Sequence, residues 1–384
     1  MKALVLSGGS GTRLRPFSYS MPKQLIPIAN KPVLEHVLTA IRDIGVTDIG
    51  IVVGNQLRAI SAALGDGSAL GVRITYIQQT EPLGLAHCVA IARDFLGDDD
   101  FVMYLGDNML PEGVAAVAAE FRAKRPAAQV VVHKVPDPQA FGVAEVAADG
   151  SVLRLVEKPA RPRTDLALIG VYFFTPAIHE AVSAIEPSAR GELEITDAIQ
   201  WLVARGETVR ASEYSGYWKD TGRVEDVLDC NREVLRTLTR SVAADVDEVS
   251  EITGPVVVEP GARVVRSRIE GPAIIGAGTL VEDSHVGPHT SVGSHCVLRD
   301  TRLDDSIVLD GASLSRVRGL YGSVIGRSAA IATVPPPEAA PEAAPEAAPE
   351  AAPGAATGVT TGPRMASSRH RLVVGDHTRI EVAA

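Results

Sequence analysis

The first 23 residues combine glycines with the positive charges of Arg13 and Lys23 in a way that suits a phosphate-bearing ligand. An apolar run at residues 3–6 predicts a buried strand. The glycines that follow it directly are Gly8, Gly9 and Gly11. Glycine allows a sharp turn and a close approach to a ligand, and successive amides in such a turn form a donor site for phosphate. Arg13 can grip a phosphate bidentately and Lys23 acts as a point charge, so we expect a nucleoside triphosphate here.

This segment matches neither of the two common phosphate-binding patterns. Thr12-Arg13 does not fit the Gly-Lys-Ser/Thr that ends a P-loop, and Gly9-Ser10-Gly11 leads to Leu14 rather than to the last glycine of a dinucleotide fingerprint. Taken alone, the segment is also compatible with a plain tight turn after the first strand. The choice between these interpretations depends on the rest of the chain.

Residues 1–240 alternate short apolar runs with amphipathic stretches, which is typical of an α/β domain. Strands are expected at residues 3–6, 49–53, 74–77, 101–105, 130–133 and 169–174. One helix face is expected from the spacing of Leu34, Val37, Leu38, Ile41 and Ile44. This alternation predicts a parallel sheet covered on both sides, whose ligands bind beyond the carboxyl ends of the strands. Residues 8–13 and 106–108 should therefore lie on the same edge.

From Val258 onward the apolar residues follow a different period. They recur every five or six positions, at Ile275, Val281, Val286, Val292, Leu298, Leu303, Val308 and Leu314. Small side chains stand four residues after several of them, at Thr279, Thr290, Cys296 and Ala312. This period fits neither a strand face nor a helix, and it predicts a parallel β-helix of stacked coils. A string of short antiparallel strands is the alternative.

The last 50 residues divide into two segments of different composition. Residues 335–369 begin with three prolines and continue as Glu-Ala-Ala-Pro repeats, which predict a disordered linker because proline blocks helix formation. Residues 370–384 contain the apolar runs 372–374 and 380–382, and we expect this segment to dock as strands on the β-helix. The expected domains are therefore residues 1–240, 241–334, 335–369 and 370–384.

Composition limits the compartment and the partners. The 384 residues carry a net charge of −10, which argues against a nucleic-acid-binding surface. The three cysteines, Cys88, Cys230 and Cys296, lie far apart and predict reduced thiols. The N-terminus has no leader pattern, and no apolar run is long enough to span a membrane. We expect a cytoplasmic protein that binds neither nucleic acid nor membrane.

Eight short motifs follow one another along the chain. They are the glycine segment with Pro22-Lys-Gln-Leu25, Gln79 with Pro82-Leu-Gly-Leu85, Leu105-Gly-Asp-Asn108, Phe141-Gly-Val143, Glu157-Lys-Pro159, Gly170-Val-Tyr-Phe173, Arg190-Gly-Glu-Leu-Glu-Ile-Thr-Asp197 and Trp218-Lys-Asp-Thr-Gly222. In this order they resemble the sugar-1-phosphate nucleotidyltransferases, in the long form with a C-terminal hexapeptide-repeat domain. The resemblance covers about residues 1–334 and 370–384. Ser7, where alanine is usual, and Met21-Pro22, where a small polar residue is usual, depart from the family pattern.

The resemblance implies both a fold and a reaction. The fold is a Rossmann-like domain with a mixed sheet, followed by a left-handed parallel β-helix. The reaction is transfer of a thymidylyl group from dTTP to α-D-glucose 1-phosphate, with Mg²⁺, as the first step of dTDP-deoxysugar synthesis of the kind used for antibiotic sugars. Use of UTP or another sugar phosphate, acyl transfer in the β-helix, and a non-catalytic nucleotide-sugar regulator are the alternatives.

The resemblance also implies roles for individual residues. Nucleotide binding is expected at Leu6, Gly8, Gly9, Gly11, Thr12, Arg13, Lys23, Gln79, Pro82, Gly84 and Asp107. Sugar-phosphate binding is expected at Asn108, Gly142, Glu157, Lys158, Val171 and Arg190. Arg13, Lys23 and Asp107 are the expected catalytic residues, and Asp107 and Asp220 the expected Mg²⁺ ligands. Turns favour Asp for structural reasons, so the metal assignment depends on both motifs being present.

The β-helix sequence contains three closely spaced histidines, His285, His289 and His295. Hexapeptide-repeat acyltransferases often use a histidine as general base, and a metal site is another possibility. We expect His285 and His289 to lack carboxylate or thiolate partners, so solvated turn residues are the favoured interpretation. Rods of stacked coils tend to associate side by side, so the protein is expected to be a homo-oligomer.

Overall fold

The computed structural model describes residues 1–334 and 369–383, in two compact units, Met1–Leu238 and Thr239–Ala384. The predicted linker lies outside the described residues except for Arg369. Each unit has its own sheets and its own hydrophobic core.

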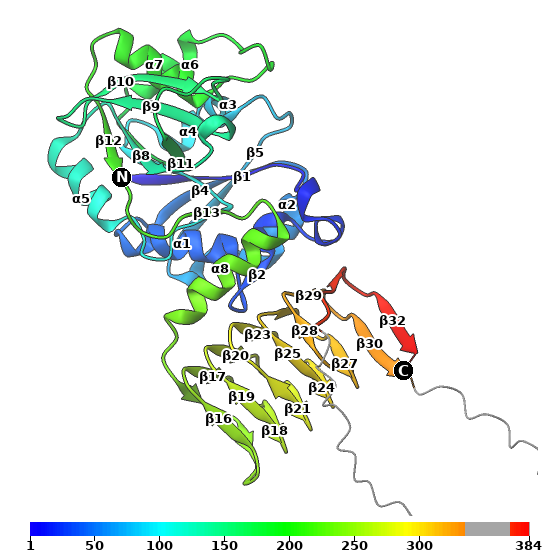
Figure 1. Cartoon of the computed structure of the whole chain (residues 1–384). Helices are drawn as coiled ribbons and strands as arrows, with labels where there is room; N and C mark the ends of the chain where they lie inside the picture. The colour runs from blue at the N-terminus through cyan, green and yellow to red at the C-terminus, as the bar shows by residue number, and fades with distance from the viewer. Residues whose placement is uncertain (335–368, 384) are drawn as a thin grey trace, which may run out of the picture. The chain divides into compact units, whose positions relative to one another are not determined.

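A nine-stranded sheet forms the centre of the first unit (Figure 1). Its main path runs β10-β9-β11-β6-β1-β4-β5, with β8 beside β11 and β12 beside β8. The strands are β1 (Lys2–Ser7), β4 (Asp48–Val53), β5 (Arg73–Gln78), β6 (Phe101–Leu105), β8 (Ala128–Lys134), β9 (Gly142–Val146), β10 (Val152–Glu157), β11 (Leu166–Phe174) and β12 (Val209–Glu213).

The sheet is mixed, as the family resemblance implies. Strands β6, β1, β4 and β5 are parallel, whereas β11 runs antiparallel to β6, β8 and β9. The purely parallel sheet expected from strand–helix alternation is therefore wrong. A continuous apolar run such as Leu166–Phe174 is buried on both faces, so its pattern carries no information on its direction.

Helices cover both faces of this sheet. Successive residues of a strand point to opposite faces, so each strand contributes side chains to two separate cores. Ala3 and Val5 pack in a core with the first group of helices, whereas Leu4 and Leu6 pack in a core with the second. The first group is α1 (Val33–Asp43), α2 (Leu57–Leu64) and α5 (Ala115–Lys124). The second group is α3 (Leu85–Ile91), α4 (Arg93–Leu96), α6 (Ile178–Ala184) and α7 (Ile195–Ala204).

Short elements complete the first unit around the carboxyl edge of its parallel strands. Three 3₁₀ turns follow β1, at Thr12–Leu14, Phe17–Tyr19 and Lys23–Leu25. A small hairpin pairs β2 (Pro27–Ile28) with β3 (Lys31–Pro32), and a two-stranded antiparallel sheet pairs β7 (Asn108–Met109) with β13 (Lys219–Asp220). Helix α8 (Val224–Arg236) follows, and its Asn231 Oδ1 accepts a hydrogen bond from Ala29 N–H at 2.9 Å.

The second unit consists of three parallel sheets that the chain visits in turn (Figure 1). The first sheet contains β14 (Ser241–Val242), β17 (Val256–Val258), β20 (Ala273–Ile275), β23 (Thr290–Val292), β26 (Ile307–Val308), β29 (Val324–Ile325) and β31 (Val373–Val374). The second contains β15 (Asp245–Val246), β18 (Arg263–Val265), β21 (Leu280–Glu282), β24 (Val297–Arg299), β27 (Ser313–Ser315), β30 (Ala330–Val334) and β32 (Arg379–Ala383). The third contains β16 (Glu251–Thr253), β19 (Arg268–Glu270), β22 (His285–Val286), β25 (Arg302–Asp304) and β28 (Leu320–Tyr321).

This arrangement confirms a β-helix and fits the left-handed form that the resemblance implies. All eight apolar positions of the predicted repeat are fully buried, and so are the four small residues named with them. Equivalent residues of neighbouring coils lie about 17 positions apart, as Ser250, Ser267, Ser284 and Thr301 illustrate. One predicted period of five or six residues is therefore one side of a three-sided coil.

The C-terminal segment adds a final coil to the second unit. β31 pairs with β29 in parallel, and β32 pairs with β30 from Ala330 opposite Arg379 to Val334 opposite Ala383. Leu320 and His370 form a further parallel bridge. Each sheet of the β-helix thus gains one more rung or bridge from residues that follow the low-complexity segment.

The three histidines do not share one environment. His289 and His295 have positive φ values of 61° and 55°, as residues of tight turns do. His285, by contrast, lies on β22, and its Nε2 is 3.3 Å from Glu270 Oε1. The expectation that His285 lacks a carboxylate partner is therefore wrong, because β19 and β22 are paired strands of neighbouring coils, which places Glu270 beside His285 although 15 positions separate them in the sequence.

Candidate active site

The glycine segment after β1 folds around the side chains of Lys23 and Gln24. Gly9 and Gly11 have φ values of 93° and 61°, which side chains rarely tolerate. A Cβ on Gly9 would lie 3.4 Å from Lys23 Cε, so the lysine lies directly against the loop. The buried Gln24 donates from Nε2 to the Gly8 carbonyl oxygen at 2.7 Å, which fixes the loop from behind.

Lys23 and Asp107 form an ion pair between Nζ and Oδ2, although 84 residues separate them in the chain. Both side chains are largely buried. Asp107 follows β6, the parallel neighbour of β1, so the two loops meet at the carboxyl edge of the sheet. Asn108 Nδ2 donates to the other carboxylate oxygen of Asp107 at 3.1 Å. The structure thus brings two predicted catalytic residues together on the predicted edge.

The two-stranded antiparallel sheet of β7 and β13 brings Asp220 to the same place. Asp220 pairs with Asn108 across this sheet, and Thr221 donates to the Asp107 carbonyl oxygen from its N–H at 3.0 Å and its hydroxyl at 2.8 Å. Arg13 lies close by, because a Cβ on Gly222 would be 3.0 Å from Arg13 Nη2 and 3.3 Å from Asp220 Oδ2. Two motifs distant in sequence therefore join into one charged cluster.

Asp220 is electrostatically strained in this cluster. Burial and then the nearby charge of Asp107 raise the pKa of Asp220 to about 6, and its Oδ1 is buried without a hydrogen-bond partner. A buried carboxylate oxygen that lacks a partner fits a bound cation. Among the described residues no group of three or more His, Cys, Asp or Glu side chains gathers as a metal site. Two carboxylates suffice for Mg²⁺ when substrate phosphates complete its coordination, so these residues fit that metal.

A cavity of about 310 Å³ opens beside this cluster. Eight of the predicted nucleotide-binding residues line it, namely Leu6, Gly8, Gly9, Lys23, Gln79, Pro82, Gly84 and Asp107. The other three, Gly11, Thr12 and Arg13, are not among its lining residues. A neighbouring hollow of about 400 Å³ shares Ser7, Gly8, Gly9, Gly54, Gln79 and Pro82 with it and extends to residues 55 and 56. The eight lining residues of the predicted set therefore border one region of the sheet edge.

The predicted sugar-phosphate residues form a second cluster centred on Glu157. Its Oε1 is 3.4 Å from both Lys158 Nζ and Arg190 Nη1, and its Oε2 accepts from the Thr196 hydroxyl at 3.3 Å. Gly142 pairs with Glu157 across β9 and β10, and a Cβ on Gly142 would lie 3.2 Å from Glu157 Oε2. Four of the six predicted residues thus lie together.

Two predicted sugar-phosphate residues lie elsewhere. Val171 is fully buried in β11, where it packs in the core with α1. Asn108 is 4% exposed, and its Oδ1 accepts a hydrogen bond from Trp218 Nε1 at 2.7 Å. Trp218 itself packs against the core of the first unit.

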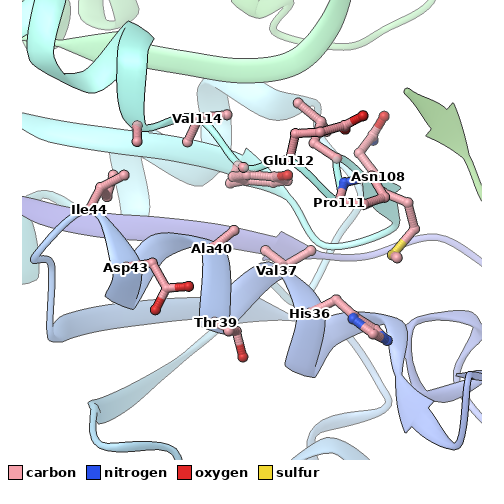
Figure 2. Close-up of a pocket in the computed structure, with 15 residues that line it drawn as sticks. His36, Val37, Thr39, Ala40, Asp43, Ile44, Asn108, Pro111, Glu112 and Val114 are labelled. Carbon is pink, nitrogen blue, oxygen red and sulfur yellow. The ribbon is translucent and has the colours of Figure 1, made fainter. Parts of the chain in front are cut away.

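Asn108 also borders a separate cavity of about 190 Å³ on the α1 side of the sheet. Figure 2 shows Val37 and Ala40 of α1 facing Pro111, Glu112 and Val114 of the segment that follows β7. None of the predicted site residues except Asn108 lines this cavity.

Sequence reasoning assigned no role to Glu192 or His87, which both lie at the site. Glu192 borders the larger cavity, and its Oε2 accepts from Arg190 Nη2 at 2.9 Å. His87 Nδ1 is 2.9 Å from Gln79 Nε2. The Arg190–Asp197 motif already contained Glu192, whereas the position of His87 on α3 gave no local signal.

Comparisons with known proteins agree with this geometry. The family model for nucleotidyl transferases matches residues 2–237, and the chain belongs to this family. The glucose-1-phosphate thymidylyltransferase of Streptomyces griseus is 52% identical over the full length of both chains. The enzyme of the same name from Streptomyces antibioticus is 49% identical over 100% of this chain and 99% of its own.

A solved structure supports the same family relationship. A protein of Bacillus anthracis assigned as a glucose-1-phosphate thymidylyltransferase is 32% identical, with a TM-score of 0.58. The match covers 63% of this chain and 97% of that one. Within the described residues, no helix has the length and apolar character needed to cross a membrane.

Proposed function

We propose that the chain transfers a thymidylyl group from dTTP to α-D-glucose 1-phosphate, giving dTDP-glucose and pyrophosphate. The observation that carries this proposal is the cluster of Lys23, Asp107, Asp220 and Arg13 at the edge of the 310 Å³ cavity. Full-length similarity to two thymidylyltransferases of Streptomyces supports the choice of nucleotide and sugar.

The reaction needs little covalent help from the protein. A phosphate oxygen of the sugar phosphate attacks the α-phosphorus of dTTP, the bond from that phosphorus to the bridging oxygen breaks, and pyrophosphate leaves with the oxygen. Lys23 and Arg13 neutralise charge that builds on the phosphates, and Asp107 holds the Lys23 ammonium in place. Asp107 and Asp220 would hold Mg²⁺, which would supply further charge neutralisation on the triphosphate.

The second cluster, around Glu157, binds the sugar phosphate that receives the thymidylyl group. Arg190 and Lys158 carry the positive charge for the sugar phosphate, and Glu157, which lies between them, accepts hydrogen bonds from sugar hydroxyls. Glu192 and Glu194 also contact Arg190, at 2.9 and 3.7 Å, and hold it in place before the substrate arrives.

The test is a pyrophosphate-release assay of the purified protein with Mg²⁺, across dTTP, UTP, dCTP, ATP and GTP and several sugar 1-phosphates. We expect the highest kcat/KM with dTTP and glucose 1-phosphate, and measurable use of UTP, because one methyl group is worth only about 1–3 kcal/mol of selectivity. Equal or better turnover with ATP or GTP would contradict the proposal.

A further inference from the structure

We propose that His87 is a positioning residue that fixes the Gln79 amide with its oxygen toward the nucleotide, so that the site selects bases with an N–H at ring position 3. This inference rests on the proposed function and identifies the base class that the site accepts. It assigns a task to a side chain that neither the motifs nor the reaction itself requires.

The side-chain nitrogen of Gln79 makes two polar contacts. Nε2 lies 3.3 Å from the carbonyl oxygen of Gly84 and 2.9 Å from His87 Nδ1. The nitrogen and oxygen of a glutamine amide are similar in shape, so the bonding network decides which is which. A carbonyl oxygen can only accept, so the Gly84 carbonyl must face the NH₂ group of Gln79 and not its oxygen.

The orientation of Gln79 then determines the role of His87. Because the NH₂ group also faces His87, Nδ1 of the imidazole accepts and the ring proton resides on Nε2. Both amide hydrogens are thereby used. No hydrogen bond to Gln79 Oε1 is found among residues 1–334 and 369–383, and Gln79 borders the 310 Å³ cavity. The atom left to read a ligand is therefore an acceptor.

Both anchors are rigid parts of the fold. Gly84 has a φ of 102°, and a Cβ there would lie 2.4 Å from the Leu193 carbonyl oxygen, so the turn admits only glycine. Backbone hydrogen bonds from Leu193 N–H to Leu83 at 2.8 Å, and from Ala86 N–H to Leu193 at 3.0 Å, hold it in place. His87 lies on α3 between residues 86 and 88, whose side chains are buried.

The orientation of the Gln79 amide determines which bases it can bind. Thymine and uracil carry a hydrogen on N3, whereas N3 of cytosine is an acceptor that would face Gln79 Oε1 without a proton between them. A site built to bond an N–H rejects an analogue that lacks it by as much as about 10⁴-fold. The inferred orientation therefore admits thymine and uracil nucleotides and excludes cytosine nucleotides.

The experiment compares wild type with His87→Leu, His87→Gln and the control His179→Leu, which replaces a half-buried histidine on α6. KM and kcat are measured for dTTP, dCTP and glucose 1-phosphate. We expect His87→Leu to raise the KM for dTTP about tenfold, as loss of one hydrogen bond would. The ratio of kcat/KM for dTTP to kcat/KM for dCTP should fall by about the same factor. The glucose 1-phosphate KM should stay within about twofold of the wild-type value.

The amide oxygen introduced by His87→Gln can accept the same N–H, so that variant should retain wild-type selectivity for dTTP over dCTP. The control His179→Leu should match the wild type in both KM and kcat.

Long-range proton–nitrogen NMR spectra of the free protein give a readout that does not depend on turnover. We expect the His87 proton on Nε2, and a proton on Nδ1 of the neutral ring would overturn the proposal. So would wild-type selectivity in His87→Leu, failure of His87→Gln, or comparable wild-type use of dCTP and dTTP. A wild-type protein that turns over no thymidine nucleotide would refute the proposed function itself, and the inference with it.

Discussion

The hydroxyl ladder of the β-helix and the active-site edge of the first unit differ in how their buried polar groups are satisfied. In the ladder each hydroxyl oxygen accepts a hydrogen bond from the next coil: Ser267 N–H donates to Ser250 Oγ, Ser284 N–H to Ser267 Oγ, and Thr301 N–H to Ser284 Oγ, all at 3.0–3.1 Å. At the edge of the first unit, Ser7 Oγ, Gln24 Oε1 and Asp220 Oδ1 are buried without a hydrogen-bond partner.

This difference distinguishes polar groups that stabilise the fold from polar groups that bind substrate. A coil that repeats can give each hydroxyl the same neighbour, so polar groups there stabilise the stack. A site that must bind charged substrates keeps carboxylates and cations whose partners arrive with the ligand. Changes at the edge should therefore affect turnover with little loss of stability, and changes in the hydroxyl ladder should do the reverse.

The largest effect is expected from Asp107→Asn. This change keeps the side-chain shape but removes the charge that pairs with Lys23 and that would hold the metal. We expect kcat to fall by at least about 10³-fold, or about 4 kcal/mol in the barrier, with the fold retained by circular dichroism. The control Asp98→Asn alters an exposed aspartate that pairs with Arg93 and should leave kcat unchanged. Activity within about tenfold of wild type would remove Asp107 from the mechanism.

A smaller and more selective effect is expected from Arg190→Gln. The guanidinium contacts Glu157 and Glu192 and carries charge proposed for the sugar phosphate. We expect the KM for glucose 1-phosphate to rise about 10- to 100-fold, the cost of a lost charge-assisted hydrogen bond, while the dTTP KM changes little. Arg205→Gln, which disrupts an exposed pair with Glu180, is the matched control. A shift confined to the dTTP KM would place Arg190 on the nucleotide side instead.

Ser284→Ala tests the opposite half of the comparison. The buried Ser284 hydroxyl accepts from Thr301 N–H at 3.1 Å and donates to the Glu282 carbonyl oxygen at 2.7 Å. Its removal should lower the free energy of unfolding of the β-helix by about 1–3 kcal/mol, because a buried N–H loses its acceptor. Turnover below the unfolding transition should be unchanged. Ser313→Ala, at a half-buried residue of β27, should cost less than about 0.5 kcal/mol in the same denaturant titration.

The smallest effect is expected from Glu194→Gln. Burial is the main cause that raises the pKa of Glu194, so the folded state holds its proton more tightly than the unfolded state does. The stability that this protonation contributes is fully present below the unfolded-state pKa and is lost as pH rises through the folded-state pKa. Denaturant titrations of both proteins should agree at low pH, and the wild type should lose stability relative to the variant as pH rises past the ordinary glutamate range. Parallel curves would show that Glu194 titrates normally.

The sequence predicted the parts of the fold that depend on local pattern. Residues 3–6 and 101–105 lie in strands β1 and β6, and the period from Ile275 to Leu314 marks the β-helix core, because burial on one face leaves a direct trace in spacing. The antiparallel direction of β11 left no such trace. The contact of Lys23 with Asp107 and that of Gln79 with His87 depend on the conformations of the loops that carry these residues, which the local sequence pattern does not predict.

In the final coil, the C-terminal strands β31 and β32 extend two sheets of the β-helix. Leu372 N–H donates to Ser323 Oγ across 49 positions of sequence, whereas the equivalent bond from Ser284 N–H to Ser267 Oγ spans 17. Without β32, the long outer edge of Ala330–Val334 would present unpaired backbone groups, which favour edge-to-edge aggregation. Because the covering strand arrives through a long connection, the same hydrogen bonds can form within one chain or by exchange with a second copy. Covalent connection favours the internal partner until protein concentration approaches the effective concentration of the tethered strand.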